Sequence, residues 1–295
     1  MNIYESEAYD LFRCCSSSKE ITIDIIETIE KRMKKKFASD FLETGIPGFN
    51  LYKEELIILA GRPSIGKTGF ALSLIHQLSI NKNISTAYLT IGVMNRNKFG
   101  QRLVSIGTMV DNAKLETGIM DALEISAIQN YCENLYDSGK IFFQNIPNCN
   151  REVFFEYVGK TIKEKNIQFL IIDDAELFRE LVDSDKEQYS WELEEVLGNI
   201  WDFAMTFKIP VMCIWPLSET TDNSIPNIKS FYQNMLIPDM ADTVLLLNRE
   251  LPMECTHTPY LNTQLIIAKS KNDLERIIPM KFDFCTASFV FDEDK

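Results

Sequence analysis

The sequence predicts an α/β fold in which helices flank a twisted, mainly parallel sheet that ends in antiparallel strands. Three observations lead to this prediction. From Glu54 onward, short apolar runs alternate with amphipathic segments, as in successive β-α-β units. One strand-to-helix junction carries the glycine-rich motif of a phosphate-binding loop. Near the C-terminus, apolar runs follow one another without helices between them, which indicates an antiparallel extension.

The elements follow in chain order. Ser17 and Glu20 have capping-box spacing, and an apolar residue recurs every four positions at Ile21, Ile25, Ile29 and Met33, which predicts a helix over about 17–37. We expect strands at 56–60, 86–91, 141–144, 169–173, 211–215, 243–247, 264–269 and 277–282. We expect helices at about 67–80, 95–107, 121–137, 151–165 and 189–207. The chain then divides into an N-terminal segment, residues 1–39, and one domain, residues 40–295.

The phosphate-binding motif fits the pattern G-x-x-x-x-G-K-[ST] at every fixed position, through Gly61, Arg62, Pro63, Ser64, Ile65, Gly66, Lys67 and Thr68. The two glycines let backbone N–H groups approach phosphate oxygens that a Cβ would crowd. In such loops the lysine reaches the β- and γ-phosphates and the hydroxyl holds Mg²⁺. The motif therefore predicts that the chain binds a nucleoside triphosphate together with Mg²⁺.

A second acidic element is needed to orient the magnesium shell. Four apolar residues, 169–172, run directly into Asp173 and Asp174. This pattern is typical of a buried strand that ends in a carboxylate. Asp173 is the candidate for the metal shell.

Composition and charge narrow the classes of protein to which this chain can belong. The chain has 295 residues, a net charge of −13, no signal-peptide pattern, and no run near the ~20 apolar residues that span a bilayer. Its seven cysteines lack metal-ligand spacing, so we expect reduced thiols, no zinc site and a cytoplasmic location. The negative charge argues against broad adhesion to a polyanion but leaves a narrow contact with single-stranded DNA open.

The stretch ELIILAGRPSIGKTGFALSL resembles the start of the motor domain of DnaB-type replicative DNA helicases, a hexameric branch of the RecA-like ATPases. The resemblance continues through FLIIDDAEL, IPDMADTVLLLNRE and IIAKSKND, and it covers about residues 40–292. It implies a RecA-like P-loop NTPase fold, ATP and Mg²⁺ as ligands, and a homo-oligomer, with a hexamer favoured. The segment 17–37 resembles the family's linker helix, which docks on the adjacent subunit. We expect no counterpart of the family's separate N-terminal domain.

The sequence departs from the family at four functional positions. Val93 stands where the family has the glutamate that polarises the attacking water, and Pro216 replaces a glutamine that senses the γ-phosphate. The family's trans-acting lysine and arginine correspond to Lys269 and Lys271. The DNA-contacting loop has no matching arginine and glycine, which leaves Tyr232, Gln233 and Asn234 as the candidate DNA contacts.

Three functions remain open from the sequence. The leading hypothesis is an ATP-binding, DnaB-helicase-like protein of DNA replication with impaired hydrolysis, acting as a nucleotide-gated oligomer or as a partner of a replicative helicase. The alternative is an active ATP-dependent helicase that translocates on single-stranded DNA, with Asp174 as substitute base. A third possibility is a RecA-like scaffold or interaction protein with no DNA role. Whether the chain is an enzyme is therefore undecided.

Overall fold

A computed structural model describes residues 17–19, 22–23, 25–26, 29, 40–90, 94–146, 151–173, 186–217, 224–231, 234–249 and 260–291. The chain divides into two compact units, Met1–Asp40 and Phe41–Lys295. In the first unit, Ile25 and Ile29 are helical, and Thr22 donates a hydrogen bond to the Ser18 carbonyl oxygen at 2.7 Å. Ile21 and Met33 of the predicted stripe lie outside the described residues.

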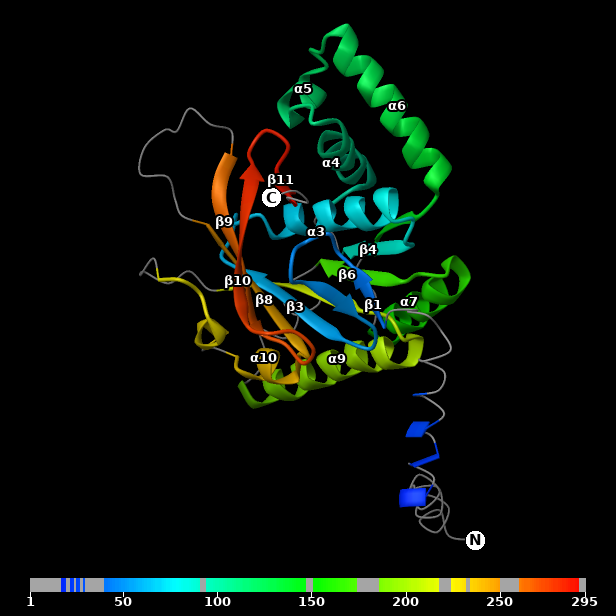
Figure 1. Cartoon of the computed structure of the whole chain (residues 1–295), viewed down its shortest axis with the longest axis vertical. Helices are drawn as coiled ribbons and strands as arrows, with labels where there is room; N and C mark the ends of the chain where they lie inside the picture. Colours follow the sequence, from blue (N-terminus) through cyan, green and yellow to red (C-terminus); the bar gives the residue numbers. More distant parts are fainter. Residues whose placement is uncertain are drawn as a thin grey trace. The chain divides into compact units, whose positions relative to one another are not determined.

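In the described part of the second unit, a nine-stranded sheet has the order β11-β10-β9-β8-β3-β7-β6-β4-β5 (Figure 1). Its strands are β3 Leu56–Gly61, β4 Thr86–Thr90, β5 Ile141–Asn145, β6 Phe169–Asp173, β7 Val211–Pro216, β8 Thr243–Arg249, β9 Tyr260–Lys269, β10 Arg276–Asp283 and β11 Ser288–Val290. The strands from β8 to β5 pair in parallel, and those from β8 to β11 pair antiparallel. A separate antiparallel pair joins β1 Phe41–Glu43 to β2 Asn50–Tyr52. The predicted mainly parallel sheet with an antiparallel C-terminal extension is confirmed.

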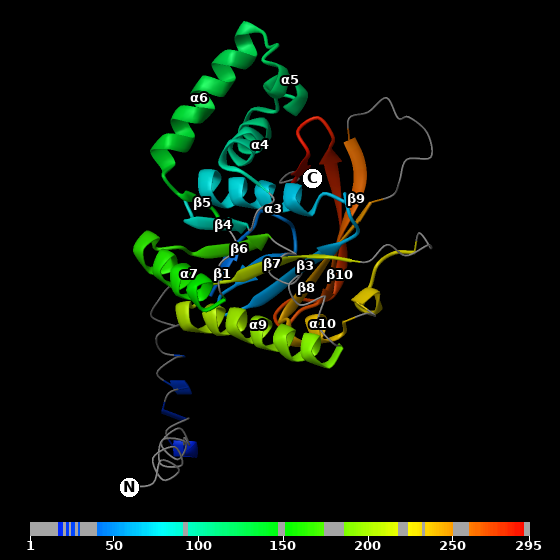
Figure 2. The ribbon, with the colours of Figure 1, turned by 180° about the vertical axis from the view of Figure 1, so that it is seen from behind.

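Helices cover both faces of this sheet. Figures 1 and 2 show α3 on one face and α7 and α9 on the opposite face. The helices are α3 Lys67–His76, α4 Arg96–Thr108, α5 Asn112–Thr117, α6 Ala122–Ser138, α7 Arg151–Lys165, α9 Lys186–Phe207 and α10 Leu236–Met240, with a π-helical turn η1 Gln77–Asn81 and a 3-10 turn η2 Ile228–Phe231. No helix among the described residues combines the length and apolar character needed to cross a membrane.

The core lies in two layers separated by the sheet. Every residue of β3 is buried, and successive residues alternate between the layers. Leu56, Ile58 and Ala60 belong to the layer that includes α7 and α9 residues, whereas Ile57 and Leu59 belong to the layer that includes α3 residues. A strand buried on both sides reads as an unbroken apolar run, which is why the sequence predicts this strand so directly. The loop that follows β3 is thereby held by the centre of the sheet.

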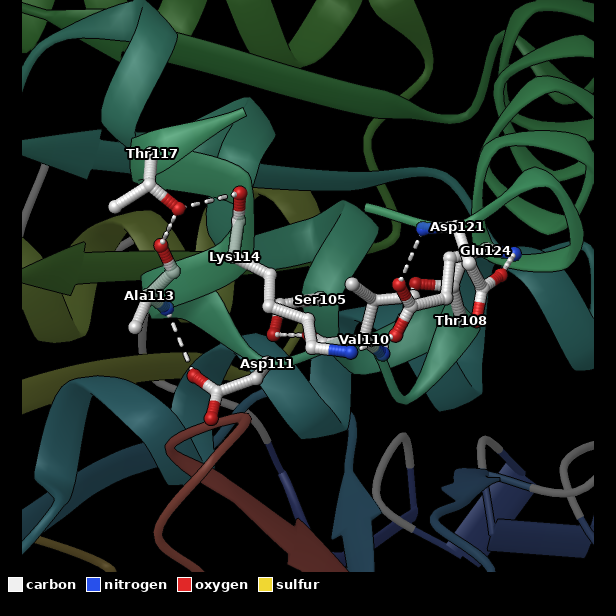
Figure 3. Close-up of polar contacts among 9 residues, drawn as sticks. All are labelled: Ser105, Thr108, Val110, Asp111, Ala113, Lys114, Thr117, Asp121 and Glu124. Carbon is white, nitrogen blue, oxygen red and sulfur yellow. Dashed lines mark hydrogen bonds and ion pairs between the residues drawn. The ribbon is translucent and has the colours of Figure 1, made fainter. Parts of the chain in front are cut away.

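Three helices, α4, α5 and α6, lie between β4 and β5 in the chain, and side-chain caps fix the starts of α5 and α6 (Figure 3). The Asp111 carboxylate accepts a hydrogen bond from the Ala113 N–H at 2.8 Å at the start of α5. Asp121 and Glu124 form a reciprocal capping box at the start of α6, with N–H to carboxylate distances of 2.8 and 3.0 Å. Lys114 joins the two helices through an ion pair with Glu124 at 2.5 Å. The short α5, which the sequence did not predict, is stabilised by these local contacts.

Candidate nucleotide site

The phosphate-loop residues, 61–68, leave the sheet at the carboxyl end of β3 and enter α3. Gly61 is in parallel register with Pro216 of β7 and Leu247 of β8, so its backbone is flanked on both sides. A Cβ on Gly61 would lie 2.8 Å from the Ile65 Cγ2 atom and 3.2 Å from the Leu247 carbonyl oxygen. Gly66 has a φ of 107°, in the left-handed region that favours glycine. Both fixed glycines of the motif therefore have a steric reason in this fold.

Arg249, the last residue of β8, contacts the phosphate loop at Ser64. Its Nη2 donates a hydrogen bond to the Ser64 carbonyl oxygen at 2.9 Å. Its guanidinium lies over the Phe282 and Phe284 rings, 5.1 and 5.3 Å from their centroids. The antiparallel extension is thereby connected to the phosphate loop. Sequence reasoning missed Arg249 as a site residue, although it stands within a stretch that carries the family resemblance.

Lys67 is the first residue of α3, and its ammonium group rests on the loop itself. The Nζ atom donates to the Gly61 carbonyl oxygen at 2.8 Å and to the Arg62 carbonyl oxygen at 3.0 Å. Burial lowers the pKa of Lys67 to about 8, and the nearby Asp173 carboxylate opposes that shift. The structure thus keeps a cation with a reduced pKa beside a helix N-terminus, where anionic oxygens are favoured.

Thr68 and Asp173 meet across the space between α3 and the end of β6. The Thr68 hydroxyl donates a hydrogen bond to Asp173 Oδ2 at 2.9 Å. The Tyr88 hydroxyl, from β4, also hydrogen-bonds to Asp173 Oδ2. A hydroxyl and a carboxylate are hard oxygen ligands of the kind that Mg²⁺ accepts together with phosphates and water. The donor set therefore fits the magnesium ion expected from the sequence.

The position of the expected γ-phosphate sensor carries no side-chain donor. Pro216 is exposed at the end of β7, beside Gly61. The next residue, Leu217, donates its backbone N–H to the Gly61 carbonyl oxygen at 3.0 Å. The strand end thus reaches the loop by backbone contact alone. Val93 and Asp174, the other residues in the hydrolysis argument, lie outside the described residues.

Lys269 and Lys271 lie at the opposite end of the sheet from the phosphate loop. Lys269 Nζ donates to the carbonyl oxygens of Pro238, Asp239 and Ala241 at 2.9, 3.0 and 2.6 Å, and so supports the end of α10. Lys271 is largely exposed and forms an ion pair with Asp242 at 3.6 Å. Within one chain, both lysines thus lie at the end of the parallel strands opposite to Lys67.

Asp242 shows how this opposite end is built. It accepts the Leu56 backbone N–H, at the start of β3, at 3.0 Å. Beside it, the buried Glu55 accepts a hydrogen bond from the Asn272 side chain at 2.5 Å. Burial raises the pKa of Glu55 to about 7, and the charges of Asp242 and Asp273 add to that rise. This network holds the turn between β9 and β10, which carries Lys271.

The candidate DNA contacts are described only in part. Tyr232 and Gln233 lie outside the described residues. Asn234 donates its backbone N–H to the Phe231 carbonyl oxygen at 2.6 Å. Phe231 itself is buried in the core layer that includes α7 and α9 residues. This aromatic side chain therefore packs locally.

Comparisons with known proteins place this geometry in a family. The model of the DnaB-like helicase C terminal domain matches residues 38–291. The replicative DNA helicase DnaB of Treponema pallidum (strain Nichols) is 23% identical over 277 residues, covering 92% of this chain and 61% of that protein. A probable replicative DNA helicase of Trieres chinensis is 25% identical over 288 residues, covering 95% of this chain and 62% of that protein. The chain thus spans about three-fifths of the length of these relatives.

Solved structures show the same fold at low sequence identity. One of them, an isolated ATPase domain, has a TM-score of 0.73 and 17% identity, and the match covers 94% of this chain and 99% of that one. A DnaB-like replicative helicase studied with primase has a TM-score of 0.71 and 18% identity, covering 94% of this chain and 67% of that one. These likenesses confirm the predicted RecA-like fold.

Proposed function

Since this chain belongs to the DnaB-like helicase C-terminal domain family, we propose that it is an ATP-binding member that serves in DNA replication with impaired ATP hydrolysis. In this proposal it acts as a nucleotide-gated oligomer, with a hexamer favoured, or as a partner of a replicative helicase. The observation that carries the proposal is the assembled Thr68–Asp173 pair beside Lys67, next to a strand end where Pro216 offers no side-chain donor.

Nucleotide binding uses groups that the loop and α3 already hold together, with one rearrangement at Lys67. Lys67 moves its ammonium group from the Gly61 and Arg62 carbonyl oxygens to the β- and γ-phosphates. The first amides of α3 and the loop backbone donate to phosphate oxygens. Thr68 and Asp173 would hold Mg²⁺, which would neutralise phosphate charge.

Turnover needs groups that this chain lacks at the corresponding positions. Val93 cannot accept a proton or orient water, and loss of a general base typically lowers a rate by about 10² to 10⁴. Pro216 cannot report the γ-phosphate by a side-chain hydrogen bond. Lys271 keeps a positive charge but lacks the bidentate fork of arginine, so it stabilises a transition state less well. Since Lys271 lies away from the loop of its own chain, any such contribution comes from a neighbouring copy.

The direct test measures ATP binding and ATP hydrolysis in parallel, with and without single-stranded DNA. The wild-type chain is expected to bind Mg²⁺-ATP and to hydrolyse it only slowly, without stimulation by DNA, whereas the Lys67→Ala variant is expected not to bind. Brisk, DNA-stimulated turnover that disappears in Lys67→Ala would contradict impaired hydrolysis.

The second candidate is a working helicase whose base is Asp174. The observation that favours it is that Asp174 directly follows the metal-shell acid Asp173. Here Asp174→Asn separates the two candidates, because only the working helicase loses turnover on that change. A scaffold with no DNA role is recognised by the absence of salt-sensitive binding to single-stranded DNA, since phosphate contacts weaken as salt rises.

A further inference from the structure

Tyr88 is a buried aromatic residue whose hydroxyl reaches the metal site. It is the central residue of β4 and is 0% exposed. In the pairing of β4 with β6, Tyr88 lies opposite Ile171, and Thr90 lies opposite Asp173. Tyr88 and Ile171 belong to the core layer that includes α3 residues, so the tyrosine lies on the face from which Thr68 approaches.

The ring and the hydroxyl of Tyr88 have different surroundings. The ring packs against Phe99 and Phe143, with centroids 5.4 and 6.3 Å away. The hydroxyl hydrogen-bonds to Asp173 Oδ2, the same oxygen that accepts the Thr68 hydroxyl at 2.9 Å. Burial, together with the neighbouring Asp173 carboxylate, raises the pKa of Tyr88 well above its ordinary value, so the phenol stays protonated at neutral pH and donates to the carboxylate. Two donors on one oxygen hold this carboxylate in a single orientation.

We propose that Tyr88 is a positioning residue for the metal, whose hydroxyl fixes the Asp173 carboxylate in the orientation in which Asp173 and Thr68 take Mg²⁺ together. The proposal rests on the proposed nucleotide site. Partners of this kind orient metal ligands, and their removal typically lowers metal affinity about 10- to 100-fold. Tyr88 contributes to the magnesium-dependent part of nucleotide binding, and the phosphate loop supplies the rest.

A purely structural role makes a different prediction. If only the ring mattered, phenylalanine would serve equally well, because Tyr88→Phe keeps the packing on Phe99 and Phe143 and removes only the hydroxyl. The chain offers a matched control in Tyr131. Its ring is buried on α6, and within the described part of the chain its hydroxyl has no hydrogen-bond partner. Tyr131→Phe therefore removes a buried hydroxyl without removing a hydrogen bond of the kind that Tyr88 makes to Asp173.

The test titrates a fluorescent ATP analogue against wild type, Tyr88→Phe and Tyr131→Phe, first without Mg²⁺ and then over a range of Mg²⁺ concentrations. Tyr88→Phe is expected to raise the half-saturating Mg²⁺ concentration about 10-fold and to leave metal-free nucleotide affinity unchanged. Tyr131→Phe is expected to change neither. In an Asp173→Asn background, Tyr88→Phe is expected to have no further effect, because the carboxylate that it orients is gone.

The outcomes separate this inference from the proposed function. An unchanged Mg²⁺ requirement in a folded Tyr88→Phe chain that binds the analogue would overturn the role of Tyr88 and leave nucleotide binding intact. An equal effect of Tyr88→Phe with and without Asp173 would overturn it too. Failure of the wild-type chain to bind the analogue would overturn the proposed function, and the role of Tyr88 with it.

Discussion

Lys67 is a half-buried lysine at the first position of α3. It rests on carbonyl oxygens of its own loop, and its burial lowers its pKa to about 8. A bound triphosphate favours the charged form of Lys67. Above this pKa, Lys67 must therefore take up a proton when the nucleotide binds. Below it, the ammonium group is already present. By linkage, nucleotide affinity is flat below about pH 8 and declines above it.

Titrations between pH 7.5 and 9.5 check this expectation. Affinity for ATP should fall by up to about tenfold for each pH unit above the lowered pKa of Lys67. Lys67→Arg is the matched variant, because a guanidinium stays charged throughout this range, and its decline should be absent. A wild-type affinity that does not change over the range would refute the lowered pKa.

The sequence predicts some site residues and not others, for a physical reason. Gly61, Lys67 and Thr68 are recognised because the loop chemistry is local and its spacing is fixed by the backbone. Tyr88 and Arg249 act on partners 85 and 185 residues away in the chain, so no local pattern announces them. Their roles are visible only once the sheet has brought β4 beside β6 and β8 beside β3.

Helix α6 buries one of its side chains against the rest of the domain. Tyr131 is the buried residue of α6 within the described structure, and its ring lies 5.6 Å from the His76 ring of α3. The ring also fills the space beside Gly107 of α4. A Cβ built there would lie 2.0 Å from the Tyr131 ring. The glycine is therefore what lets α6 pack closely on α4.

Two glycines of α4 provide a matched test of this packing. Gly107→Ala should lower the free energy of unfolding by about 1–3 kcal/mol, because the new methyl group collides with Tyr131. Gly100→Ala has no atom within 4 Å of its new Cβ, and should raise that free energy by about 1 kcal/mol through helix propensity. Urea denaturation measures both. Equal effects of the two substitutions would show that Tyr131 does not anchor α6.

The elements differ in how well their patterns predict them. The sequence predicts buried strands such as β3 and β6 within a residue of their bounds, because burial on both faces requires an unbroken apolar run. The predicted helix at 67–80 corresponds to α3 followed by the π-helical turn η1. The short α5 and α10 were missed, since helices of six and five residues are too short to show a helical period.

In the whole domain, two sets of candidate functional residues lie at opposite ends of the parallel strands. The phosphate loop and Asp173 lie at the carboxyl ends of the parallel strands, whereas Lys269 and Lys271 lie beyond the start of β3. A single chain therefore does not assemble the complete set, which supports the oligomer proposed above. The fold class is predictable from the sequence because the buried strands of the sheet and the phosphate loop are encoded locally. The number of subunits depends on surfaces between chains and not on a local pattern.

The proposal that ATP is bound but turned over slowly is tested by a single-turnover measurement. Protein in excess over labelled ATP is mixed with Mg²⁺ and single-stranded DNA, and ADP formation is followed over time. A typical enzyme turns over at about 10 s⁻¹. Loss of the base at Val93 lowers this to roughly 0.1 to 0.001 s⁻¹, so we expect bound ATP to persist for seconds to minutes whether or not DNA is present. Complete conversion within about a second, accelerated by DNA, would contradict the proposal.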